Sequence, residues 1–117
     1  MNNYFNKSIN SYRIQIDTEN ILKLQNLLGK NFYFQIESEG LTSLALKGLS
    51  ITNEHLELIS EFVALQTLHL NNNKLTSLKG IEKLKNLKYI NLSGNNIDKN
   101  ELLEFKNANL NKITIIH

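Results

Sequence analysis

One segment carries the pattern on which the fold depends: Leu65-Gln-Thr-Leu68-His-Leu70-Asn-Asn-Asn73-Lys-Leu75. Two further segments align with it without gaps, Leu41-Thr-Ser-Leu44-Ala-Leu46-Lys-Gly-Leu49-Ser-Ile51 and Leu87-Lys-Tyr-Ile90-Asn-Leu92-Ser-Gly-Asn95-Asn-Ile97. A fourth copy, which is truncated, begins Leu110-Asn-Lys-Ile113-Thr-Ile115. The copies start 24, 22 and 23 residues apart, a spacing typical of a structural unit that repeats along the chain.

The positions within each copy have distinct physical roles. Apolar residues at the first, fourth and sixth positions are separated by mostly polar ones, which predicts a short strand with one buried face. The ninth position holds Asn73 and Asn95, whose amides can donate to and accept from the orphan backbone groups of a turn. Leu49 takes this place in the first copy, so we expect an incomplete asparagine ladder there. Residues that accept a positive φ, and therefore predict a turn, occupy the eighth position: Gly48, Asn72 and Gly94.

Over residues 41–117 both the pattern and the period resemble the leucine-rich repeat, L-x-x-L-x-L-x-x-N-x-L. The middle copy, residues 65–86, is similar to the 22-residue type of the bacterial internalins. The resemblance implies an α/β fold, a short right-handed solenoid with a parallel concave sheet of about four strands and a mixed α/3₁₀ convex side. It also implies a role in protein binding and no enzymatic activity.

The segments that return the chain between copies predict helices of different tightness. Over residues 75–90 the apolar residues recur at every third position, which predicts a tight 3₁₀-like return. The first return is two residues longer and predicts a short α-helix opened by Thr52 or Asn53. In the third return, Asp98-x-x-Glu101 resembles a capping box. The apolar face expected for the first helix consists of Leu56, Ile59 and Val63.

Residues 1–40 do not follow the repeat and predict a strand–helix–strand cap over the apolar end of the first coil. Tyr12-Arg-Ile14-Gln-Ile16 and Phe32-Tyr-Phe34-Gln-Ile36 alternate like strands. Between them, Asp17-Thr18 predicts the start of a helix and Gly29 its end. An alternative use of Phe32, Tyr33 and Phe34 is a stacking platform for bases, but alternation places Phe32 and Phe34 together in the core. We expect one domain over 1–117, with the cap at 1–40 and about three and a half repeats at 41–117.

Composition restricts the function classes. The chain has 117 residues, no cysteine and a net charge of +2, so thiol chemistry is excluded and nucleic-acid binding is not indicated. We expect no signal peptide, no membrane association and a cytoplasmic location. The richness in Asn, Lys and Ile points to a bacterial or protist source.

The concave face of the predicted sheet is the first candidate binding surface. The third and fifth positions of each strand point toward it, and the second and seventh border it. Tyr89 is its one large aromatic residue, and Lys88 and Lys112 favour an acidic surface on the partner. The residues predicted to bind the partner are Thr67, His69, Asn71, Lys88, Tyr89, Asn91, Lys112 and Thr114.

The last strand is the second candidate. We expect it to form an edge with unpaired backbone groups, and such edges invite pairing with another chain. Three isoleucines lie there, Ile113, Ile115 and Ile116. A homodimer through this edge is therefore possible on the pattern alone.

Catalytic and metal-binding chemistry are not indicated. The three histidines, His55, His69 and His117, do not have metal-ligand spacing, and we expect no cofactor. Thr67 and Ser43 share the predicted face of His69, but no acidic residue joins them there. The sequence therefore predicts a protein–protein interaction module, in its sharpest form a small bacterial inhibitor or immunity-type protein. The alternative is a structural protein that self-associates through its last strand.

Overall fold

The computed structural model describes the backbone of residues 2–117 and the side chains of residues 11–117. Its elements follow one another in the order α1 (Asn2–Leu28), β1 (Tyr33–Glu37), β2 (Gly40–Ala45), α2 (Asn53–Ile59), β3 (Thr67–His69), the 3₁₀-helix η1 (Ile81–Lys83), β4 (Tyr89–Asn91), α3 (Lys99–Ala108) and β5 (Thr114–Ile116). Helices alternate with strands from β2 onward, so the predicted α/β class is confirmed.

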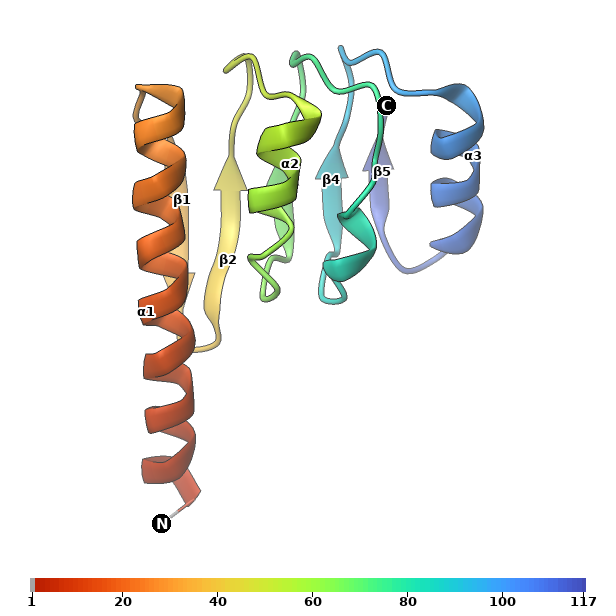
Figure 1. The fold of residues 1–117 in the computed structure, drawn as a ribbon. Helices are drawn as coiled ribbons and strands as arrows, with labels where there is room; N and C mark the ends of the chain where they lie inside the picture. Colours follow the sequence, from red (N-terminus) through yellow and green to blue (C-terminus); the bar gives the residue numbers. More distant parts are fainter. Residues whose placement is uncertain (1) are drawn as a thin grey trace.

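The five strands form one sheet in chain order, β1-β2-β3-β4-β5. β2 to β5 are parallel, with one helical return between each pair, and β1 is antiparallel to β2. Figure 1 shows α1, α2 and η1 on one side of this sheet and α3 alongside β5. Two neighbouring parallel strands require a crossover connection, and such crossovers are right-handed. Successive returns of the repeat therefore lie on the same side of the sheet.

The core lies between the sheet and the returns. The fourth position of each of the first three copies points into it, and Leu44, Leu68 and Ile90 are fully buried. From the first helix, Ile21 and Leu24 join the same apolar cluster. The 3₁₀ return is confirmed: η1 occupies Ile81–Lys83, and the apolar residues of its three-residue period are all buried.

Asparagine side chains join the coils at the turns that leave the sheet. Asn73 Oδ1 accepts from the N–H groups of Leu49 and Ile51 at 3.0 and 2.9 Å, and its Nδ2 donates to Leu46 O at 2.9 Å. Asn95 repeats this one coil later, accepting from Leu75 N at 3.0 Å. The predicted turn residues all have positive φ: Gly48 at 66°, Asn72 at 59° and Gly94 at 72°.

The two longer returns are α-helices. Thr52 is the N-cap of α2, and the Nδ1 atom of His55 accepts from Thr52 N at 3.0 Å. Asp98 caps α3 by accepting from Glu101 N at 3.1 Å. The capping box is incomplete, because the carboxylate of Glu101 accepts instead from Ser77 Oγ of the preceding coil at 2.8 Å.

The prediction for the apolar face of the first return is wrong at one position. Phe62 is fully buried, whereas Val63 is 37% exposed. Helical spacing from Ile59 would bury Val63, but α2 ends at Ile59 and the chain turns, with Phe62 N donating to Ile59 O at 3.1 Å.

The strand predicted at Tyr12–Ile16 is wrong, because α1 continues through these residues as a single helix. The alternation of Tyr12, Ile14 and Ile16 is equally compatible with a helix, and no glycine or proline interrupts residues 2–28. Asp17 is therefore inside the helix and does not cap it. It is fully buried, pairs with Arg13 one turn earlier at 2.6 Å, and accepts from Leu41 N at 2.8 Å. The N-terminal segment is helix–strand, and the helix ends before Gly29, whose φ is +64°.

The register predicted for the fourth copy is also wrong, by two residues. Tyr89 pairs with Thr114, and Ile90 pairs with Ile115. A shift of two keeps every side chain on the same face, so alternation alone cannot distinguish the two registers. The return through α3 is longer than expected, so β5 begins two residues later in the chain. Leu110, the expected first core position, is 66% exposed.

Candidate functional site

The sheet face opposite the returns is the largest regular surface that the strands present. Two rows of side chains cross it, because directly paired residues share a face of the sheet. We call these ten positions the open face; it corresponds to the predicted concave face. The first row is Gln35, Ser43, Thr67, Tyr89 and Thr114, and the second is Tyr33, Ala45, His69, Asn91 and Ile116.

An aromatic pair lies at the middle of the open face. The ring centroids of His69 and Tyr89 are 5.2 Å apart, with the planes inclined by 52°. Both side chains are half-buried, and they come from the adjacent strands β3 and β4. The contact limits the rotation of both rings in the unbound protein, so less side-chain conformational entropy is lost when a partner binds.

The open face carries no Asp, Glu, Lys or Arg at its ten strand positions. Its polar groups are hydroxyls, amides and an imidazole, and some of them are already ordered. Asn91 Oδ1 accepts from Ser93 Oγ at 2.7 Å. Tyr33 Oη donates to Gln35 Oε1 at 3.1 Å, and Gln35 Nε2 donates to Glu37 Oε1 at 2.9 Å.

The predicted site residues separate into three groups. Thr67, His69, Tyr89, Asn91 and Thr114 lie on the open face. Asn71 follows β3 and Lys88 precedes β4, and both border that face. Lys112 does not lie there, because the two-residue change of register places Thr114 where Lys112 was expected. Lys112 instead lines a cavity between the η1 coil and α3.

Sequence reasoning missed part of the open face. β1 pairs with β2, which adds Tyr33 and Gln35 beside Ala45 and Ser43. The alternation around Phe34 did indicate these two residues, because a strand that buries Phe34 turns Tyr33 and Gln35 toward the opposite face. The partner strand of β1 was not deducible from the alternation, however.

The three isoleucines predicted at the last edge have different surroundings. Ile113 precedes β5 and lines the cavity beside α3. Ile115 is half-buried against the core, and Ile116, 41% exposed, belongs to the open face. Ile116 is therefore the one of the three whose side chain is largely available at this edge.

The described part of the chain contains no cluster of three or more His, Asp or Glu side chains that could hold a metal ion. In the same part of the chain, no helix combines the length and apolarity that a bilayer crossing requires.

The repeat geometry has a counterpart among known protein families. Residues 63–107, which include β3, η1, β4 and most of α3, match the family model of Leucine Rich repeats (2 copies). Residues 63–107 therefore contain two leucine-rich repeats. Domains built from leucine-rich repeats generally mediate protein–protein interaction and are typically not enzymes. No curated protein and no solved structure matches the chain.

Proposed function

We propose that this leucine-rich repeat chain binds another protein through its open face. The observation that carries the proposal is the His69–Tyr89 contact at the centre of a face with no formal charge at its strand positions. Binding energy at interfaces concentrates on buried aromatic anchors that are surrounded by a polar rim. Tyr89 and His69 are the anchors in this proposal.

The dimensions of the open face limit the partner. Five strands spaced ~4.8 Å apart give a width of about 24 Å, and strands of three residues are only ~10 Å long. The resulting few hundred square ångströms are well below the ~800 Å² that each partner contributes to a standard interface. The proposal therefore includes the rim, where Glu37, Lys47, Asn71 and Lys88 provide charged and polar contacts.

We propose further that the partner is an enzyme or toxin whose active site the open face covers, as an inhibitor or immunity-type protein of a bacterial cytoplasm would do. Support for this form of the function comes from the uncharged strand positions of the open face and from the His69–Tyr89 contact at its centre. In this proposal α1 and β1 act as the cap of the first coil, since Ile21 and Leu24 pack into its core.

Site-specific photo-crosslinking tests the open face directly. The crosslinker p-benzoylphenylalanine is placed at position 89, and as a control at position 12, where a tyrosine of α1 is 68% exposed. In native extract, a discrete adduct is expected from position 89 and none from position 12. Adducts of equal yield at both positions would count against the open face.

The matched variants test the same claim by affinity. With the crosslinked partner purified, Tyr89→Ala is expected to weaken binding by at least 1–2 kcal/mol, the scale of an interface anchor, while Tyr12→Ala leaves it unchanged. If the partner is an enzyme, its activity should fall in proportion to occupancy. A partner that stays fully active while bound contradicts the inhibitor form of the proposal but not the binding itself.

The alternative function is self-association through β5. Its support is the position of β5 at one side of the sheet order, with Ile116 41% exposed beside it. Sedimentation velocity at high micromolar concentration tests it, with Ile116→Lys as the variant expected to dissociate any dimer. A monomer under these conditions eliminates this alternative.

A further inference from the structure

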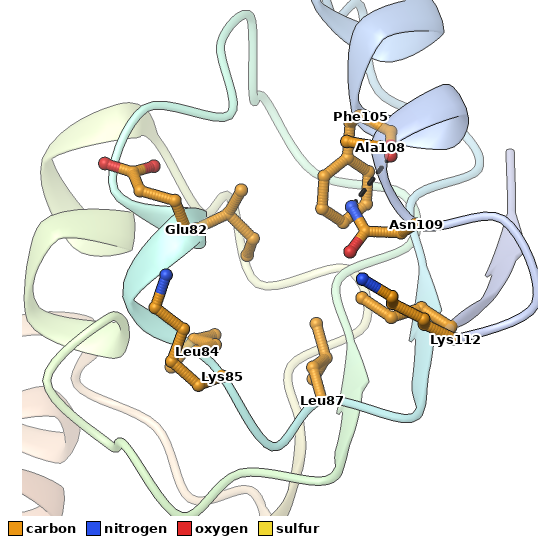
Figure 2. Close-up of a pocket in the computed structure, with 10 residues that line it drawn as sticks. Glu82, Leu84, Lys85, Leu87, Phe105, Ala108, Asn109 and Lys112 are labelled. Carbon is orange, nitrogen blue, oxygen red and sulfur yellow. Dashed lines mark hydrogen bonds between the residues drawn. The ribbon is translucent and has the colours of Figure 1, made fainter.

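A cavity of about 390 Å³ lies between the η1 coil and α3 (Figure 2). None of the ten open-face positions lines it, so it is separate from the surface proposed above. Polar or exposed residues form its rim: Glu82, Lys85, Ala108, Asn109 and Lys112. Its floor is apolar and consists of Ile81, Leu84, Leu87, Phe105 and Ile113.

The cavity results from two neighbouring returns that differ in shape. η1 is a three-residue 3₁₀-helix, whereas α3 is an α-helix of 10 residues, and none of the residues of α3 is buried. The seventh residue of α2, Ile59, is fully buried, but the seventh residue of α3, Phe105, is only half-buried. A wide helix beside a narrow one therefore leaves Phe105 and Ile113 only partly covered, above the buried Ile81, Leu84 and Leu87 of the η1 coil.

The polar side chains at the rim of the cavity differ in position and in their hydrogen-bond partners. Figure 2 shows Lys85 and Lys112 on opposite sides of the cavity. Glu82 is already engaged, because its Oε2 accepts from Gly80 N at 3.0 Å. Asn109 Nδ2 donates to Phe105 O at 2.8 Å, and Figure 2 shows its side-chain oxygen directed toward the cavity.

The charge around the cavity is positive. The charged residues that line it are Lys85, Lys112 and Glu82, two positive and one negative, which gives a net charge of +1. In the described part of the chain, neither Lys85 nor Lys112 forms a salt bridge. The field at the rim therefore favours anionic groups.

We propose that this cavity is a second docking site and that its occupant is an acidic peptide segment of a partner protein. One large apolar side chain of the segment packs on the apolar floor of the cavity, and carboxylates on either side of it meet Lys85 and Lys112. Asn109 Oδ1 accepts a backbone N–H of the segment. The volume of about 390 Å³ is at the lower end of the range for ligand sites.

A peptide titration followed by amide NMR shifts tests this site. The probe is the acetylated, amidated peptide Glu-Asp-Leu-Glu-Asp, added to the ¹⁵N-labelled full chain at low ionic strength. Shifts are expected at the amides of Leu84, Lys85, Phe105, Asn109 and Lys112, and not at those of His69 and Tyr89. A peptide with serine in place of leucine should bind about tenfold more weakly, which equals 1.4 kcal/mol. A peptide with Gln and Asn in place of the acids should bind at least fivefold more weakly.

Matched variants separate charge from shape. The pair Lys85→Gln and Lys112→Gln should weaken the probe at least fivefold, while Lys47→Gln with Lys74→Gln, two exposed lysines away from the cavity, should change its affinity less than twofold. Ala108→Trp fills the cavity without removing a charge and should abolish the shifts. Circular dichroism confirms that each variant is folded.

Several outcomes would overturn the proposal. They are a failure of the probe to shift any cavity amide at millimolar concentration, equal losses for the two lysine pairs, and an Ala108→Trp variant that binds normally. Shifts caused by dodecanoate but not by the peptide would assign the cavity to an anionic amphiphile. Concentration-dependent shifts without any probe would assign it to a second copy of the chain. Tyr89→Ala should leave the probe affinity unchanged, so failure here is distinguishable from failure of the open-face proposal.

Discussion

Replacing Asn73 with alanine removes a side chain that joins two coils at once. Its Oδ1 accepts from two backbone N–H groups of the first coil, Leu49 and Ile51, and its Nδ2 donates to Leu46 O. Leu70 O also loses a bond to Asn73, but it keeps the bond from Asn95 Nδ2 at 2.8 Å. Three half-buried backbone groups are therefore left without a protein partner.

The expected loss of stability follows from that count. A buried polar group left unsatisfied costs about 1–3 kcal/mol, and the lower end applies here because the site is only partly buried. Asn73→Ala should then lower the free energy of unfolding by about 3 kcal/mol. The matched control is Asn95→Ala, which leaves only Leu75 N and Leu92 O unpaired and should cost about 2 kcal/mol.

Urea unfolding followed by far-UV circular dichroism measures both values by linear extrapolation. The order matters more than the absolute size, because both substitutions remove the same chemical group from equivalent turns. A loss below about 1 kcal/mol for Asn73→Ala, or a larger loss for Asn95→Ala, would refute the claim that cross-coil bonds set the contribution of each asparagine.

Three further stability predictions can be checked in the same urea assay. Asp17→Ala breaks the buried pair with Arg13 and should cost about 3 kcal/mol, and a loss under 1 kcal/mol would mean that the pair does not hold α1 in place. Gly40→Ala would place a Cβ 2.6 Å from Asp17 Oδ2 at a φ of +124° and should cost at least ~2 kcal/mol, so a variant of unchanged stability contradicts this packing. Leu110→Ser should change the free energy of unfolding by no more than ~0.5 kcal/mol because Leu110 is 66% exposed, whereas Ile115→Ser should lower it by more. The reverse order would support the register expected from the sequence pattern.

Two of the predictions that failed share one physical cause. Tyr12–Ile16 alternates as a strand would, yet a helix can also bury Asp17 beside Arg13 and Leu41. The fourth copy fits two registers that differ by two residues, and both place the same faces inward. In each case local periodicity allows two structures, and contacts with distant residues choose between them.

The amino-acid sequence by itself determined the repeat, the parallel strands, the positive-φ turns and the tight 3₁₀ return. These features depend on spacing within one coil or between adjacent coils, and such spacing is visible in the chain. The tertiary structure decided that β1 widens the open face, that Lys112 leaves it, and that a cavity lies beside Phe105. The first feature depends on the pairing of the N-terminal segment with the first coil. The other two depend on how returns of unequal width pack side by side, which is a property of neighbouring coils and not of either sequence alone.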